Sequence, residues 1–343
     1  MKACVLHAVG DLRFEEAADP VLQPGEALLR IKASGVCGSD VQRVFEKGTY
    51  HFPTIPGHEF SGEVIAVYDG MDASLIGKRA AVFPILPCRA CPACEVGEYA
   101  LCEHYDYYGS RRDGGFAEYL AVKQWNLVFI PDSVSFEEAA MCEPASVAVH
   151  ALSQAGIELG DILAVYGAGT IGIMLAKIAK LRGAGDVILV DIDPAKLDAA
   201  HRFGFTHTIN SLEADAPAQI LAQTGGRGAD AVIEGTGASA AFENCVKSAK
   251  TLGRVVLMGN PLREMTLGQS VYSSLLRKQL TLRGTWNSSY STAKNDWVTA
   301  VNAMPSLRLK ELITHSFPLS AGAKAIEVLR DKKEFVIKSM YIM

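Results

Sequence analysis

Four cysteines crowd into one short, proline-containing loop of the chain. Cys88, Cys91, Cys94 and Cys102 follow the spacing C-x2-C-x2-C-x7-C. Four thiolates satisfy a tetrahedral zinc ion and leave no position free for a substrate, so a site of this kind is structural. Buried cysteines without a metal seldom recur at two-residue spacing in a polar loop. The segment therefore predicts a structural zinc site.

Three further segments carry side chains that bind catalytic metals. Cys37 lies in GVCGSD, His58 and Glu59 lie in PGHEFSG, and Glu143 lies in AAMCEPAS. A thiolate, an imidazole and a carboxylate would leave the fourth position of a zinc ion open for a substrate. Each residue also has an ordinary structural interpretation, as a buried thiol, a core histidine or a carboxylate at a helix start. Pro144 disfavours a helical conformation at Glu143, which suits a side chain that points into a cleft.

A glycine-rich segment between a predicted strand and a predicted helix has the spacing of a dinucleotide site. The strand DILAVY is followed by GAGTIG and then by the helical pattern IMLAKIAKLRG. Asp191 ends the next strand, where a carboxylate accepts hydrogen bonds from the adenosine ribose and repels a 2′-phosphate, which favours NAD over NADP. Such a turn can serve close packing alone, but strand, helix, spacing and carboxylate together favour the cofactor. The residues expected to contact NAD are Gly167, Gly169, Thr170, Ile171, Gly172, Asp191 and Lys196.

The elements that must position these residues follow two patterns. Up to residue 146, short β runs such as EALLRIKAS and SGEVIAVY are broken by Gly and Pro, which predicts an antiparallel, barrel-like domain. From Asp161, six apolar strands alternate with helical patterns, which predicts an α/β domain with a doubly wound parallel sheet. The last segment, with DWVTAVNAM and EFVIKSMYIM, is expected to return to the first domain. The predicted domains are 1–146, 147–286 and 287–343, with SVAVHALSQAG as a helix between the first two.

Composition limits the class of function. With 343 residues, of which 49% are hydrophobic, the chain is long enough for two compact domains. The formal charge of -5 gives no general attraction to polyanions, so no nucleic-acid partner is expected. The first residues lack the pattern of a signal peptide and no apolar run reaches spanning length, so we expect a cytoplasmic protein without a membrane partner.

The order of these motifs resembles that of the zinc-containing medium-chain dehydrogenases, and the resemblance spans the chain. It rests on GVCGSD, GHEFSGEV, the four-cysteine loop, DGGFAEY, the glutamate before Pro144 and GAGTIG. It implies a GroES-like β-barrel catalytic domain beside a Rossmann domain, with NAD and two zinc ions per chain, one catalytic and one structural. It also implies Cys37, His58 and Glu143 as ligands of the catalytic zinc, with Glu59 as the alternate carboxylate.

The same resemblance assigns the proton transfer. It implies that the hydroxyl of Ser39 takes the proton of the alcohol, although Ser39 and Asp40 could instead cap local backbone N–H groups. Many relatives continue the relay through a histidine at the position of Gln42, which cannot titrate here. His51 could serve in its place, or could be an ordinary surface-loop histidine.

Two arginines indicate the class of substrate. Arg43 stands where sorbitol-type relatives often carry tyrosine, and Arg111 lies in YDYYGSRRDGGFAEY, a run that resembles the galactitol-1-phosphate 5-dehydrogenases. A guanidinium binds a phosphate bidentately. Trp286 and Asn287 follow the last Rossmann strand, where the resemblance places substrate-facing residues. Each arginine could instead be a surface charge, and Trp286 could fill a domain or subunit contact.

We therefore expect an oxidoreductase that transfers a hydride from a secondary hydroxyl of a polyol phosphate, similar to galactitol 1-phosphate, to NAD. The product would be a ketose phosphate. A dehydrogenase of an unphosphorylated polyol or diol, or of L-threonine, remains an alternative, as does a zinc-stabilised NAD-binding sensor without turnover. The resemblance also implies a homodimer or homotetramer, in which the strands RVVLMGN and LTLRGTW pair across a two-fold axis.

Overall fold

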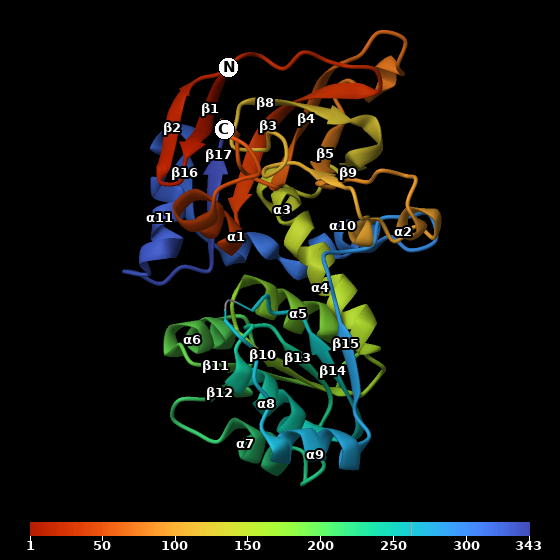
Figure 1. Cartoon of the computed structure of the whole chain (residues 1–343), viewed down its shortest axis with the longest axis vertical. Helices are drawn as coiled ribbons and strands as arrows, with labels where there is room; N and C mark the ends of the chain where they lie inside the picture. The colour runs from red at the N-terminus through yellow and green to blue at the C-terminus, as the bar shows by residue number, and fades with distance from the viewer. Residues whose placement is uncertain (262) are drawn as a thin grey trace. The chain divides into compact units, whose positions relative to one another are not determined.

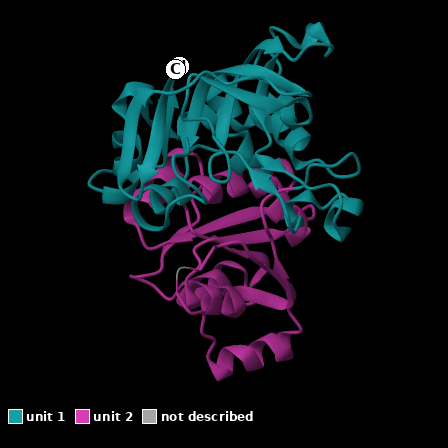
Figure 2. Cartoon of the chain, turned by 45° about the horizontal axis from the view of Figure 1, so that its top comes forward, with its two compact units in different colours: residues 1–146, 289–343 teal, residues 147–288 magenta. Residues whose placement is uncertain are grey.

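The computed structural model describes residues 1–261 and 263–343 (Figure 1). The chain divides into two compact units, residues 1–146 with 289–343 and residues 147–288 (Figure 2). Helix α4 (Cys142–Ala155) carries the chain from the first unit into the second. The C-terminal segment belongs to the same unit as the N-terminus.

The first unit is built on a seven-stranded sheet in which the long strand β3 is central. The strand order is β16-β17-β3-β4-β5-β9, and β8 also pairs with β3. Every pairing in this sheet is antiparallel except that of β16 with β17. A separate hairpin, β1 with β2, and a short pair, β6 with β7, complete its strands. The bounds are β1 (Lys2–Ala8), β2 (Asp11–Glu16), β3 (Glu26–Val36), β4 (Glu59–Val67), β5 (Arg79–Val82), β6 (Ile85–Leu86), β7 (Asp106–Tyr107), β8 (Tyr119–Lys123), β9 (Leu127–Phe129), β16 (Ile313–Pro318) and β17 (Lys338–Ile342).

The helices of the first unit are mostly short. Ser135 and Glu138 form a reciprocal capping box at the start of α3, and the side chain of Asn295 caps α10. A π-helical turn follows α1 directly. The bounds are α1 (Gly38–Gln42), the π-turn (Arg43–Lys47), α2 (Pro92–Glu95), α3 (Phe136–Ala140), α10 (Asp296–Leu307) and α11 (Lys324–Asp331).

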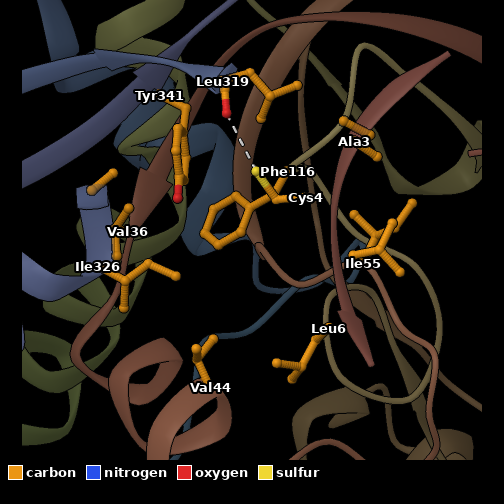
Figure 3. Close-up of a cluster of buried hydrophobic side chains, with 13 residues drawn as sticks. Ala3, Cys4, Leu6, Val36, Val44, Ile55, Phe116, Leu319, Ile326 and Tyr341 are labelled. Atoms are coloured by element: carbon orange, nitrogen blue, oxygen red, sulfur yellow. Dashed lines mark hydrogen bonds between the residues drawn. The ribbon is translucent and has the colours of Figure 1, made fainter. Parts of the chain in front are cut away.

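A buried apolar cluster joins the two ends of the chain within the first unit (Figure 3). Cys4 from β1 and Tyr341 from β17 lie in this cluster with Phe116, and the thiol of Cys4 donates to the carbonyl of Leu319 at 3.4 Å. Burial raises the pKa of Cys4 to about 12, so this thiol behaves as a small apolar side chain. The packing fixes β17 beside β3.

The second unit contains a six-stranded parallel sheet, which confirms the predicted doubly wound fold. In the order β12-β11-β10-β13-β14-β15, the chain adds strands on one side of β10 up to β12 and on the other side from β13 onward. Ligands of such sheets bind where the side changes, between β10 and β13 and beyond the carboxyl ends of the strands. The strands are β10 (Ile162–Tyr166), β11 (Asp186–Asp191), β12 (Thr208–Asn210), β13 (Ala229–Glu234), β14 (Ala249–Leu257) and β15 (Thr281–Gly284). The helices are α5 (Thr170–Leu181), α6 (Pro194–Arg202), α7 (Ala216–Gln223), α8 (Ser239–Ser248) and α9 (Gln269–Lys278).

One local prediction from the sequence is wrong. Glu143 is helical, because α4 already begins at Cys142 and includes both Glu143 and Pro144 in its first turn. The first N–H groups of a helix have no intrahelical partner, so a proline there costs no hydrogen bond. Among the described helices, none is both long and apolar enough to cross a membrane.

Candidate active site and cofactor site

The four clustered cysteines of the first unit converge in space. Their sulfur atoms all lie within 4.8 Å of one another, and three of the four residues are buried. Helix α2 begins directly after Cys91 and carries Cys94, while a 3-10 turn ends just before Cys102. Backbone N–H groups of Glu103 and Cys94 lower the pKa of Cys91 to about 6, which favours its thiolate. The donor set fits a tetrahedral zinc ion with no open position.

Aromatic packing supports this loop. The guanidinium of Arg89 lies 4.2 Å from the ring centre of Trp125 and 5.7 Å from that of Tyr99. The two rings also meet edge to face at 5.2 Å. Arg89, the residue after Cys88, therefore holds the cysteine loop against the rings of Tyr99 and Trp125.

Strands β3 and β4 bring a second set of possible metal ligands together. Cys37 follows the last residue of β3, and Glu59 is the first residue of β4, where it pairs with Gly35. The sulfur of Cys37, a ring nitrogen of His58 and a carboxylate oxygen of Glu59 lie within 4.8 Å of one another. His58 and Glu59 are buried. One thiolate, one imidazole and one carboxylate fit a catalytic zinc ion that keeps a position for substrate.

Asp40 orients the imidazole of this group. Its carboxylate is fully buried, accepts the backbone N–H of Cys37 at 2.9 Å and lies 3.4 Å from Nδ1 of His58. Burial opposes its charge, but His58 and Arg43 together lower the pKa of Asp40 to about 2. A carboxylate on one ring nitrogen fixes the tautomer and directs the other nitrogen to a metal. The sequence indicated only a capping role for Asp40, and the structure adds this contact.

Glu143 lies near this group without being part of it. Burial raises the pKa of Glu143 to about 7, with His58 opposing the shift and Glu59 adding to it. Glu59, which the sequence assigned as the alternate ligand, reaches the cysteine and histidine, and Glu143 does not complete the same cluster. Glu59 follows His58 directly, whereas Glu143 is held in the first turn of α4.

Lys338 is the residue that sequence reasoning missed. It lies on β17, is buried, and its ammonium contacts Oε2 of Glu59 and donates to the carbonyl of Val36 at 3.1 Å. The two charged residues are 279 positions apart in the chain. No spacing rule links them, because the strand order of the sheet creates the pair.

Arg43 and Ser39 lie beside the same histidine. Nη1 of Arg43 donates to Oγ of Ser39 at 2.9 Å and to Asp40 at 3.0 Å, and it lies 3.2 Å from Nδ1 of His58. Among the described residues, Nε and Nη2 of Arg43 have no hydrogen-bond partner, and its side chain is 22% exposed. The structure therefore groups Ser39, Arg43 and His58.

Arg111 is held between two tyrosines, one from its own loop and one from a distant part of the chain. Its guanidinium lies 4.3 Å from the ring centre of Tyr50 and 4.5 Å from that of Tyr105, and it donates to the carbonyl of Tyr105 at 2.9 Å. Its Nε is buried without a hydrogen bond among the described residues. The ring of His51 is exposed, and its nitrogens face the carbonyls of Pro53 and Arg111. These contacts are those of a loop held in place by hydrogen bonds and cation–π contacts, rather than those of a proton relay.

The remaining predicted substrate residues belong to the second unit. Trp286 and Asn287 follow β15. Trp286 is 54% exposed, and Asn287 adopts a φ of 52°. Their role in substrate binding stays a prediction.

The glycine-rich turn has the shape that a pyrophosphate needs. Gly167 has a φ of +107°, and a Cβ on Gly172 would lie 1.9 Å from the carbonyl oxygen of Gly167. A Cβ on Gly169 would meet nothing within 4 Å, so the backbone there borders open space at the start of α5. Free N–H groups and the helix dipole at such a start favour an anion. The turn fits a dinucleotide.

Asp191 closes the other side of this turn. Its carboxylate accepts the N–H of Ala168 at 2.7 Å and that of Ile192 at 2.8 Å, and it lies 3.5 Å from Nζ of Lys196. Thr170 and Ile171 occupy the first turn of α5. The predicted cofactor residues thus gather around the carboxyl ends of β10 and β11.

Known proteins resemble this chain over almost its whole length. Residues 23–132 match the family model of the alcohol dehydrogenase GroES-like domain, and residues 170–305 match that of the zinc-binding dehydrogenases. Galactitol 1-phosphate 5-dehydrogenase of Escherichia coli (strain K12) is 36% identical over 331 residues, which are 95% of each chain. Sorbitol dehydrogenase of Bacillus subtilis (strain 168) is 37% identical over 266 residues, covering 76% of this chain and 75% of that one.

A solved structure agrees with these matches. The crystal structure of galactitol-1-phosphate dehydrogenase from Escherichia coli aligns over 100% of both chains, with a TM-score of 0.94 and 34% identity. The predicted pairing of a GroES-like domain with a Rossmann domain is confirmed. The chain therefore belongs to the zinc-binding medium-chain dehydrogenases and is an NAD-dependent alcohol or polyol dehydrogenase.

Proposed function

We propose that this dehydrogenase oxidises a secondary hydroxyl of a sugar-alcohol phosphate, similar to galactitol 1-phosphate, to the ketose phosphate. The observation that carries the proposal is Arg43. Its guanidinium lies beside Ser39 and His58 and uses only Nη1 in the hydrogen bonds seen among the described residues. A guanidinium with two nitrogens to spare suits the phosphate group of such a substrate.

The proposed catalytic residues divide the work between metal binding and proton transfer. Cys37, His58 and a carboxylate from Glu59 or Glu143 would hold zinc, and bound zinc lowers the pKa of a hydroxyl that reaches it. Asp40 keeps the ring of His58 in place. Cys88, Cys91, Cys94 and Cys102 would hold the structural zinc ion.

Ser39 is proposed to accept the proton of the substrate hydroxyl. Its Oγ accepts a hydrogen bond from Arg43, so its own O–H is free to pass a proton onward as it receives one. Gln42 has no titratable group. We propose that the proton leaves Ser39 toward the cofactor ribose or solvent.

The second unit is proposed to bind NAD at the carboxyl ends of its strands. The nicotinamide of NAD supplies the hydride acceptor. Gly167, Gly169 and Gly172 shape the turn, and Asp191 offers a carboxylate that favours NAD over NADP. Thr170, Ile171 and Lys196 lie around the same turn.

An unphosphorylated polyol is the second candidate substrate. Sorbitol dehydrogenase of Bacillus subtilis is 37% identical over 266 residues, and galactitol 1-phosphate 5-dehydrogenase of Escherichia coli is 36% identical over 331 residues. In that case Arg43 would serve only to donate hydrogen bonds to Ser39 and Asp40. Arg111 would then serve only to hold its loop against Tyr50.

A substrate panel with one arginine variant separates the two candidates. NADH formation would be measured with galactitol 1-phosphate, galactitol and sorbitol, for the parent protein, Arg43→Met and the surface control Arg13→Met. We expect Arg43→Met to lower the ratio of kcat/KM for the phosphorylated over the free polyol about 10- to 100-fold, the effect of roughly 1.5–3 kcal/mol. The ratio cancels any damage to Ser39 and Asp40, which both substrates share. An unchanged ratio would exclude the phosphate role.

A further inference from the structure

Lys338 and Glu59 form an ion pair that crosses an intervening strand. In the order β17-β3-β4, Lys338 lies on β17 and Glu59 on β4, with β3 between them. Their side chains are only 3% and 2% exposed, so water does not screen the pair. Burying two opposite charges is costly unless they stay paired. The contact is therefore a fixed part of the site that contains Cys37 and His58.

Gly35 is what allows the pair to form. It stands on β3 opposite Glu59 on one side and opposite Met340 of β17 on the other. A Cβ at this position would lie 2.5 Å from Oε2 of Glu59 and 2.9 Å from Cε of Lys338. Any other residue would push the two side chains apart. The central strand thus leaves a gap through which the lysine reaches the carboxylate.

The charges around this site indicate what the ion pair does. Asp40 is matched by Arg43 at 3.0 Å, and Glu59 is matched by Lys338. With Glu143 as the carboxylate ligand that the sequence resemblance implies, Glu143 and the thiolate of Cys37 would balance the two charges of a zinc ion. Glu59 is close enough to join them, because one of its oxygens lies within 4.8 Å of the Cys37 sulfur. Lys338 is therefore a competitor of the metal for Glu59.

We propose that Lys338 is a positioning residue, which engages Glu59 through the gap at Gly35 and so keeps one position on the metal open for the substrate. The proposal rests on the proposed catalytic metal site with Glu143, rather than Glu59, as its resident carboxylate ligand. Without the ammonium, the buried carboxylate of Glu59 has no other ion-pair partner among the described residues and would bind the metal as a permanent ligand.

The test replaces the charge of Lys338 and follows the metal as well as the activity. Zinc-loaded parent, Lys338→Met, Lys338→Gln and Lys338→Arg would be compared by the rate of zinc release to a chelator. Cobalt-substituted protein would be compared by its visible spectrum, which reports the ligand set. We expect Lys338→Met to slow release of one zinc ion roughly 10-fold or more, the size of effect that partners of metal ligands have. Its cobalt spectrum should change and its kcat should fall, while Lys338→Arg stays close to the parent.

Two further variants assign the effect. Cys37→Ser lacks the catalytic site and identifies which phase of zinc release belongs to it. In a Glu59→Gln background, Lys338→Met should no longer slow release, because the competing ligand is gone. Equal slowing in that background would mean that the lysine merely repels the metal, and would overturn the proposal.

The remaining outcomes are also decisive. Lys338→Gln keeps a hydrogen-bond donor for Glu59 and Val36, so it provides a neutral variant if Lys338→Met does not fold. A neutral variant with the zinc release and cobalt spectrum of the parent, and only a lower melting temperature, would show that the pair is purely structural. If the parent itself releases no zinc that depends on Cys37, the proposed catalytic site fails rather than the role of Lys338.

Discussion

Two glycines of the dinucleotide turn differ in what surrounds them, although they are three residues apart. A Cβ on Gly172 would collide with the carbonyl of Gly167 at 1.9 Å, whereas a Cβ on Gly169 would enter open space. We predict that Gly172→Ala lowers the free energy of unfolding by about 1–3 kcal/mol, since overpacking must be relieved by backbone shifts. Gly169→Ala should keep the melting temperature of the parent and bind NAD more weakly.

Thermal unfolding with and without NAD checks both variants. The φ of Gly169 is −76°, so alanine fits its backbone without strain and serves as the matched control for folding. Unchanged NAD affinity in Gly169→Ala would place the pyrophosphate elsewhere. A fully stable Gly172→Ala would contradict the collision.

Asp191 is predicted to decide between the two nicotinamide cofactors. Ala168 and Ile192 donate to different oxygens of Asp191, so Asp191→Asn keeps an acceptor for only one of these N–H groups, and it removes the negative charge that repels a 2′-phosphate. Lys196, 3.5 Å away, would then be free to attract that phosphate. We expect the ratio of kcat/KM for NADP over NAD to rise roughly 10-fold, the effect of about 1.4 kcal/mol. Steady-state kinetics with both cofactors measures it, and an unchanged ratio would remove Asp191 from cofactor choice.

At the scale of elements, the sequence predicts contacts between residues that are close together in the chain. It does not predict contacts that depend on the order of strands in a sheet. The four-cysteine loop was predicted from spacing alone, and the structure brings its sulfurs together. Lys338 could not be found in this way, because its partner depends on β17 returning beside β3. The hydrophobic pattern of EFVIKSMYIM predicts a strand, but it does not say which strand will be its neighbour.

The error at Glu143 has the same origin. Pro144 biases its predecessor away from the helical region, and that bias is a local steric preference. Here α4 begins one residue earlier, and its buried residues outweigh that bias. Tertiary packing decides the boundary of a helix in a way that a dipeptide rule cannot.

The two proposed zinc sites are predicted to fail in different ways. Cys102→Ser should lose one zinc ion and lower the melting temperature, because the loop around α2 depends on its metal for folding energy. Cys37→Ser should lose the other zinc ion and abolish turnover, while unfolding close to the temperature of the parent. Metal analysis and thermal unfolding of the two variants serve as controls for each other. Loss of both zinc ions in either variant would contradict two independent sites.

At the scale of the whole molecule, the sequence was sufficient for the architecture. Alternation of apolar strands with helical patterns predicts parallel strands, and right-handed crossovers leave few possible orders. The observed order β12-β11-β10-β13-β14-β15 is the dinucleotide-binding one. The periodicity of hydrophobic residues does not indicate which surfaces remain available to another chain.

The edge of the six-stranded sheet leads to the last prediction, which concerns assembly. Strand β15 ends the sheet, its four residues are exposed, and no other strand of the described residues pairs with its outer edge. An exposed edge strand is a template for pairing with another chain, so we predict a homodimer in which β15 meets its copy. Leu282→Arg, which places a charge on this edge, should convert the dimer to monomers in sedimentation velocity, whereas Leu212→Arg, beyond the opposite edge strand β12, should not. A monomeric parent, or a dimer that survives Leu282→Arg, would place the subunit contact elsewhere.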